Sequence, residues 1–158
     1  MYIHIQMTYR MQRRKTLGTD ARKLVEVCVG WNSRLAARRV TQFLDRELAG
    51  CGLTVAQLGL MAQIAAAADD TLGALARRAG LEQSTLSRNL RALESEGLVE
   101  VAMVEADLRR RAVWLTETGA RLLEAAIPVW RQAHVKLTTH LSPALARRLA
   151  DQAASLSD

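Results

Sequence analysis

Aromatic residues and long apolar runs are scarce in this sequence. Aromatic side chains make up only 4% of the 158 residues, so the core has to be built mainly from leucine and alanine, which favours packed helices. No apolar run approaches the roughly 20 residues that a membrane-spanning helix needs, and the first residues are too polar for the core of a signal peptide. We therefore expect a mostly α-helical, cytoplasmic protein that makes no membrane contact.

Motifs that would indicate a chemical reaction are also missing. The two cysteines, Cys28 and Cys51, have a spacing that matches neither a metal site nor a disulfide framework. The sequence has no glycine-rich phosphate loop, and neither Cys28 nor His134 has a base and an orienting group at convincing spacing. We therefore expect no cofactor, no metal and no enzymatic activity.

The net charge of +6 suggests an anionic partner, but its distribution matters more than its sum. Residues 1–50 contain 10 lysines and arginines against 4 acidic residues, whereas residues 71–114 contain 7 against 6. Residues 1–19 are basic and lack a repeating apolar pattern, which predicts a flexible N-terminal arm. A mis-assigned start codon would explain that stretch equally well.

Apolar side chains recur at helical spacing along most of the chain. One long helix is predicted from Asp20, a candidate N-cap, up to Gly50. Thr54 and Gln57 have the spacing of a capping box and open the next helix. After Asp69 and Asp70, a short helix is predicted over residues 72–79.

The next segment predicts a helix-turn-helix. Gly80 ends the short helix in a position that favours a left-handed residue. After a tight turn, a further helix ends at Gly97 and has one apolar face, formed by Leu86, Leu90 and Leu93. A short helix, a glycine-containing turn and an amphipathic helix are the pattern in which the second helix enters the major groove of DNA.

The polar face of this second helix carries side chains suited to DNA. Small hydroxyl groups and arginines lie three or four residues apart and therefore share one face. Hydroxyl groups and backbone amides suit phosphates, and Arg88 can offer two donors to a guanine. The solvated face of an ordinary surface helix is the alternative interpretation. The candidate DNA-binding residues on this helix are Gln83, Ser84, Thr85, Ser87, Arg88 and Arg91.

A β-hairpin is predicted directly after this helix. Residues 98–104 are rich in β-branched side chains, residues 109–115 alternate, and residues 105–108 would form the tip. Three arginines beside the turn would let such a wing reach phosphates or a narrow minor groove; they are Arg109, Arg110 and Arg111. The hairpin favours DNA binding and completes a winged helix-turn-helix over residues 54–115.

Two more helices are predicted after the hairpin. Thr116 can cap a long helix that Pro128 should kink, and Ser142 with Pro143 opens the last helix. One recognition helix contacts few base pairs, so specificity normally needs a dimer that binds two half-sites. The apolar stripes between Leu137 and Leu156 would suit a dimer interface, although burial within one monomer fits them equally well.

Residues 81–97 resemble the recognition helix of the MarR family of bacterial regulators; their sequence is LEQSTLSRNLRALESEG, followed by Leu98 and Val99. The segment that follows resembles the wing signature of the same family in the spacing of its residues. The residues that carry this resemblance are Gly97, Asp107, Arg109, Leu115, Thr116 and Gly119. The resemblance covers roughly residues 20–145. It implies a homodimeric transcriptional repressor that binds a pseudo-palindromic operator in double-stranded DNA.

The resemblance also implies roles for single residues. Asp107 would position the wing by pairing with an arginine, although a plain turn residue is the alternative. Arg109 would enter the minor groove. Two positions depart from the family: Leu108 replaces the usual basic residue, and Glu82 is a poor N-cap where Asp or Ser is common. A winged helix used for protein contact would need neither Arg88 nor Arg109.

A dimerisation region and an effector site are further implications of the resemblance. Residues 20–53 and 116–158 would form the helical dimerisation region. A small aromatic or phenolic effector would bind between these helices and the DNA-binding lobe, although each candidate residue also suits an ordinary core. The candidate effector-binding residues are Trp31, Met61, Trp130 and His134.

Redox sensing is an alternative mode of regulation. Some relatives sense peroxides through a cysteine in the first helix, and Cys28 is the candidate here. However, Gly30 stands at the sensing position, and Cys28 lies on the apolar face with Trp31, where a cysteine usually behaves as a small hydrophobic residue.

Overall fold

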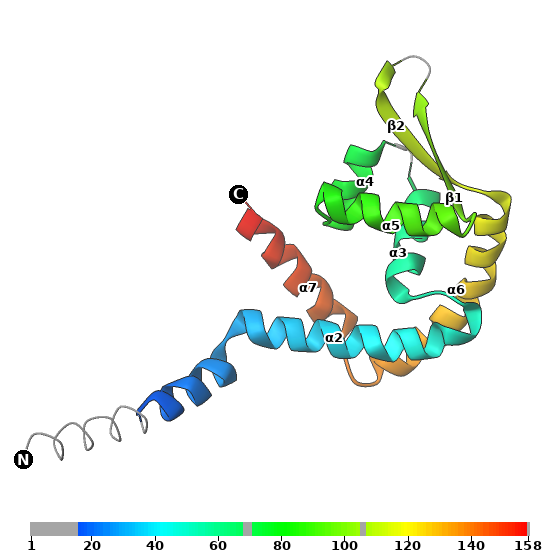
Figure 1. Cartoon of the computed structure of the whole chain (residues 1–158). Helices are drawn as coiled ribbons and strands as arrows, with labels where there is room; N and C mark the ends of the chain where they lie inside the picture. Colours follow the sequence, from blue (N-terminus) through cyan, green and yellow to red (C-terminus); the bar gives the residue numbers. More distant parts are fainter. Residues whose placement is uncertain (1–15, 68–70, 105–106, 158) are drawn as a thin grey trace, which may run out of the picture. The chain divides into compact units, whose positions relative to one another are not determined.

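The computed structural model describes residues 16–67, 71–104 and 107–157, with residues 104, 107–110 and 157 described by their backbone only. The chain divides into two compact units, residues 1–40 and 41–158. Most of the described chain is helical, with one two-stranded antiparallel sheet (Figure 1). This confirms the predicted fold class.

The first unit contains a helix over residues 16–27 and the beginning of α2 (Val29–Leu48). Asp20 lies inside the first of these helices, so the prediction that it is an N-cap is wrong. Leu17 extends the apolar spacing upstream of Asp20, and residues 16–19 are therefore helical and not part of a flexible arm. The remainder of the predicted arm lies outside the described residues.

The predicted single helix is interrupted at Cys28. The Cys28 Sγ accepts a hydrogen bond from the Trp31 backbone N–H at 3.4 Å, and the Asn32 side-chain amide donates to the Glu26 carbonyl at 3.0 Å. Side chains therefore replace part of the backbone hydrogen bonding at the break, which an apolar pattern does not reveal.

In the second unit, α2 ends in a short 3₁₀ helix, Ala49–Cys51, after which Gly52 adopts a left-handed conformation. The helix α3 (Val55–Ala65) then begins with the predicted capping box of Thr54 and Gln57. Asp45 adds a second cap, since its Oδ1 accepts a hydrogen bond from the Val55 N–H at 2.7 Å. Three side chains thus satisfy amide groups at and beside the start of α3.

The helices α4 (Leu72–Ala79) and α5 (Gln83–Ser95) form the predicted helix-turn-helix. Gly80 has φ 61° at the end of α4, and the Leu81 N–H donates to the Ala76 carbonyl at 3.0 Å. This hydrogen bond closes the end of α4 and fixes the direction in which the chain enters α5.

The strands β1 (Val99–Val104) and β2 (Asp107–Leu115) form the predicted hairpin beside α5 (Figure 1). In the paired region, Val99 lies opposite Leu115 at one end and Met103 lies opposite Arg111 at the other. The register shifts between Met103 and Val104. The second strand begins two residues earlier than the prediction of Arg109. Of the predicted tip, residues 107 and 108 therefore belong to β2, and residues 105 and 106 lie outside the described residues.

The last two helices are α6 (Glu117–Thr138) and α7 (Pro143–Ala154), and a 3₁₀ turn, Ser155–Ser157, follows them. The predicted caps are confirmed, because the Thr116 and Ser142 hydroxyls accept hydrogen bonds from the Gly119 and Leu145 N–H groups. Pro128 lies inside α6, and its kink stays a prediction.

The core of the second unit is aliphatic. Its fully buried side chains include Leu48, Met61, Leu75, Leu86, Leu93 and Val99. In contrast, α7 has no buried residue. Within the part of the chain that the structure describes, no single helix is long and apolar enough to span a membrane; only the bent pair Val29–Cys51 and Val55–Ala65 meets that test jointly.

Candidate nucleic-acid interface

The helix α5 separates an apolar face from a polar one. Leu86, Leu90 and Leu93 are buried in the core and hold the helix in place. Because these residues recur every three or four positions, the opposite face is directed outward. The predicted DNA-binding residues on this face divide into the exposed Gln83, Ser84, Arg88 and Arg91 and the half-buried Thr85 and Ser87.

The N-terminal end of α5 has little side-chain capping of its own. Its N-cap residue, Glu82, makes no side-chain cap hydrogen bond, and the first turn contains no acidic residue. The first backbone N–H groups of a helix lack intrahelical partners and carry partial positive charge. Together with the adjacent Ser84 hydroxyl, this end of the helix is suited to an anionic oxygen.

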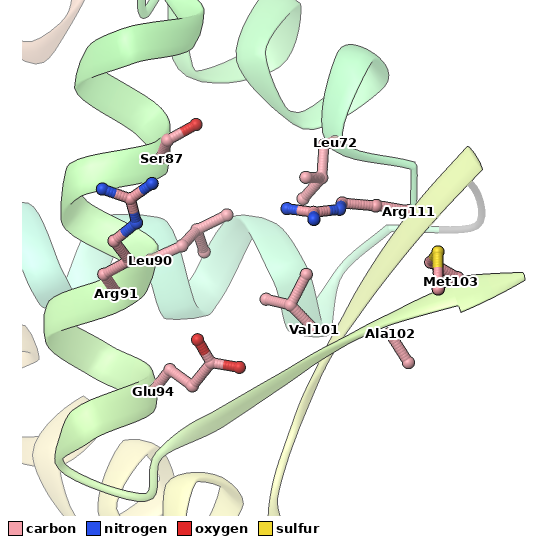
Figure 2. A pocket seen from close by; sticks show the side chains of 9 residues that line it. All are labelled: Leu72, Ser87, Leu90, Arg91, Glu94, Val101, Ala102, Met103 and Arg111. Atoms are coloured by element: carbon pink, nitrogen blue, oxygen red, sulfur yellow. The ribbon is translucent and has the colours of Figure 1, made fainter. Parts of the chain in front are cut away.

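An open groove of about 450 Å³ lies between α5 and the wing. Its apolar lining includes Leu72, Leu90 and Val101. Figure 2 shows Ser87 and Glu94 on the side of α5 that faces the wing, and Arg111 extending from β2 toward α5. The structure therefore brings Ser87, Arg91 and Arg111, three of the predicted DNA-binding residues, to one groove.

Three predicted wing residues are described by their backbone only. Asp107, Arg109 and Arg110 all belong to β2. The predicted pairing of Asp107 with an arginine, and the entry of Arg109 into the minor groove, therefore stay predictions. Farther along β2, Ala112 is buried, and its backbone pairs with that of Thr71, just before α4.

The candidate effector-binding residues have different environments. Met61 is completely buried and belongs to the main core, against which Trp130 packs. Trp130 and His134 lie one turn apart on α6 with their rings stacked at a centroid distance of 5.2 Å. Trp31 belongs to the other unit and is 53% exposed. Only Trp130 and His134 therefore form a direct aromatic pair.

The redox candidate is a half-buried free thiol. Cys28 and Cys51 are both free cysteines of intermediate exposure. The Cys28 Sγ already accepts the hydrogen bond from Trp31 at the helix break. Among the described residues, no group of three or more histidine, cysteine or acidic side chains could hold a metal ion.

Two residues at or beside the groove are not among the sequence-predicted site residues. Glu94 lines the groove beside Arg91, and its spacing of three residues from Arg91 would have placed both on one face. Gly119 contacts the backbone at the start of the wing so closely that a side chain would not fit. In the sequence, the signal for Gly119 is its place in the segment Leu115, Thr116, x, x, Gly119 of the wing signature.

A helix-turn-helix followed by a hairpin, with arginines on the second helix and on the hairpin, is a winged helix-turn-helix. A protein-family model described as "MarR family" matches residues 52–110 of this chain. This chain belongs to the MarR family, as the comparison with solved structures also shows.

The transcriptional regulator MosR of M. tuberculosis, solved in complex with DNA, has 36% sequence identity and a TM-score of 0.75. That comparison covers 82% of this chain and 98% of MosR. A MarR mutant from E. coli, complexed with operator DNA, has a TM-score of 0.71 over 84% of this chain and 96% of that one. Its identity of 24% supports similarity of fold alone.

Among curated proteins, the transcriptional regulator HosA of Escherichia coli O157:H7 is 40% identical over 77 residues. The match includes 49% of this chain and 57% of HosA. This chain therefore matches little more than half the length of that relative.

Proposed function

We propose that the protein is a sequence-specific transcriptional regulator, a repressor, that binds a pseudo-palindromic operator in double-stranded DNA as a cytoplasmic homodimer. Its role is regulatory and not enzymatic. The observation that carries this proposal is the outward polar face of α5, with Arg88 and Arg91 exposed beside a groove that Arg111 of the wing also lines. The DNA complex of the 36% identical MosR supports it.

Each part of this interface has a distinct physical role in the proposal. The core leucines of α5 keep the helix rigid, so that Arg88 can present its two donors to a guanine in the major groove. The Ser84 and Ser87 hydroxyls contact phosphates, which set the register of the helix on the duplex. The arginines of β2 extend the contacts to the neighbouring backbone and minor groove. Residues 54–115 thus form the DNA-binding domain.

Dimerisation is supported by the last two helices. In the protomer, Leu141, Leu145 and Leu149 are 44%, 62% and 44% exposed, and Val135 of α6 is 62% exposed. Because α7 has no buried residue, we favour a dimer interface over burial within one monomer, the alternative interpretation of this stripe. A row of exposed leucines is costly in water and suits a second copy of the chain, because a dimer covers the same surface on both protomers.

Replacing Arg88 by alanine is expected to weaken binding to the operator by about 1–3 kcal/mol and to relax the base preference at one position per half-site. Replacing Arg109 is expected to weaken binding to all sequences and to flatten the salt dependence, because its proposed contacts are with the DNA backbone and the minor groove. Fluorescence anisotropy with the DNA upstream of the gene, at several salt concentrations, measures both effects.

The matched control is Arg131→Ala, which removes an exposed arginine of α6 outside the groove. It is expected to leave DNA affinity nearly unchanged. Negligible losses for both Arg88→Ala and Arg109→Ala would instead favour a winged helix that contacts another protein.

We also propose that a small aromatic or phenolic effector modulates DNA affinity. The stacked rings of Trp130 and His134 support this proposal, because a planar ligand can stack on such a pair. Titration with aromatic acids is expected to change tryptophan fluorescence and to weaken DNA binding, and His134→Ala is expected to reduce both responses. If aromatic acids alter neither fluorescence nor DNA affinity, this part of the proposal is wrong.

A further inference from the structure

The groove between α5 and the wing contains one carboxylate among its cationic and polar groups. Its described lining residues include two arginines, Arg91 of α5 and Arg111 of β2, and the hydroxyl of Ser87. Glu94 is the one acidic residue in that lining, and its side chain is exposed. Figure 2 shows it on the side of α5 that faces β1. A surface suited to phosphate therefore includes one group that repels phosphate.

Within the described residues, no contact gives this carboxylate a structural role. Glu94 makes no ion pair or side-chain hydrogen bond with another residue of the part that the structure describes. Two neighbouring acidic residues differ in this respect: Glu96 accepts a hydrogen bond from the Gln57 side chain at 3.4 Å, and Glu100 accepts one from the Trp114 indole at 3.0 Å. Glu96 and Glu100 thus have structural partners, whereas Glu94 has none among the described residues.

The position of Glu94 favours the DNA backbone as the group that it faces. In a helix-turn-helix, the N-terminal residues of the recognition helix contact base edges. Glu94 lies at the opposite end, one residue before α5 ends at Ser95, beside Val101 of the wing. Arg91, Arg111 and this carboxylate line the same groove, so a phosphate bound there by the two arginines would also face Glu94.

We propose that Glu94 lowers the affinity of the protein for DNA by repelling the backbone phosphate that Arg91 and Arg111 attract. This inference rests on the proposed DNA-binding function. Phosphates occur in every sequence, so the repulsion weakens binding to unrelated DNA as well as to the operator. The contact of Arg88 with a base is unaffected. Glu94 thus weakens the electrostatic attraction by which the two arginines would otherwise bind unrelated DNA.

The test compares Glu94→Gln with Glu124→Gln, which removes the same charge from an exposed position on α6 outside the groove. At ~50 mM salt, E94Q is expected to bind both upstream DNA and a scrambled duplex about three- to tenfold more tightly than the wild type. The gain should fall below about twofold at ~300 mM salt because counterions screen the repulsion. E124Q should stay within about twofold of the wild type throughout.

A second variant tests whether the arginines and Glu94 act on the same phosphate. In an Arg111→Ala background, the gain from E94Q is expected to shrink to less than about twofold, because the phosphate is no longer held in the groove. A gain that persists in full would place the action of Glu94 outside the groove and overturn the proposal.

Other outcomes separate this inference from the proposed function. Unchanged or weaker binding by E94Q, while Arg88→Ala still loses affinity, would overturn only the role of Glu94. A change in base preference without a general gain would show that Glu94 contacts a base, which also overturns it. If the wild type binds neither duplex, the proposed function fails and this inference fails with it.

Discussion

Replacing Gly119 by alanine is expected to lower the free energy of unfolding by about 3 kcal/mol. A Cβ atom at this position would lie 2.0 Å from the carbonyl oxygen of Leu98 and 2.9 Å from its carbonyl carbon. Both are backbone atoms, so no flexible side chain can move to make room. The start of α6 would have to shift away from the start of the wing.

That junction joins three elements of the DNA-binding domain. The Leu98 N–H donates to the carbonyl of Leu93 in α5 at 2.9 Å, and the Leu98 carbonyl accepts a hydrogen bond from the Thr116 N–H at 3.1 Å. The Thr116 hydroxyl also donates to the Gly97 carbonyl at 2.7 Å. A shift of α6 would therefore disturb the wing relative to α5, and G119A is expected to weaken DNA binding as well.

Urea unfolding followed by circular dichroism measures the stability effect. The matched control is Gly59→Ala in α3, where an added Cβ meets no atom within 4 Å. In a helix this change is expected to raise the free energy of unfolding by about 0.5–1 kcal/mol. Equal stability of the two variants would contradict the close packing of α6 on the wing.

Replacing Leu145 and Leu149 together by aspartate is expected to convert the proposed dimer into folded monomers. Both side chains are exposed in the protomer, so the fold does not depend on burying them. In a two-fold dimer the change removes four leucines from the interface, and at about 1.5 kcal/mol each their burial contributes about 6 kcal/mol. This corresponds to a dissociation constant raised by a factor of about 10⁴.

Analytical ultracentrifugation measures the mass of the protein in solution. The control is Gln152→Asp, which also introduces a carboxylate on α7. Binding to a two-half-site operator should fall sharply in the double variant, whereas binding to an isolated half-site should not change. A double variant that remains dimeric and well folded would show that these leucines do not form the interface.

Most of the helices in the fold could be predicted because their ends have local signals. Thr54 with Gln57, Thr116, and Ser142 with Pro143 each satisfy backbone groups within a few residues, so the sequence alone indicates them. The break at Cys28 could not be predicted in this way. It depends on the Asn32 amide reaching back to a carbonyl six residues earlier, a contact that no short motif specifies.

The candidate site was predictable to a similar extent. Helical periodicity placed Arg88 and Arg91 on the polar face of α5, and the three core leucines confirm which face is buried. The groove depends on how the hairpin packs against α5, so the sequence did not reveal that Glu94 lies in its lining. Likewise, periodicity did not distinguish a pocket wall from a core position at Met61, which is completely buried.

The most direct test of the central claim is the affinity of the protein for the DNA upstream of its gene, measured across a range of salt concentrations beside a scrambled duplex. Arg91 and Arg111 from two protomers would contribute four phosphate contacts, which predicts that log K falls against log salt with a slope of about −3 or steeper. The upstream DNA should also bind more tightly than the scrambled duplex at every salt concentration. Binding that shows neither the slope nor the preference would contradict sequence-specific recognition of DNA by α5 and the wing.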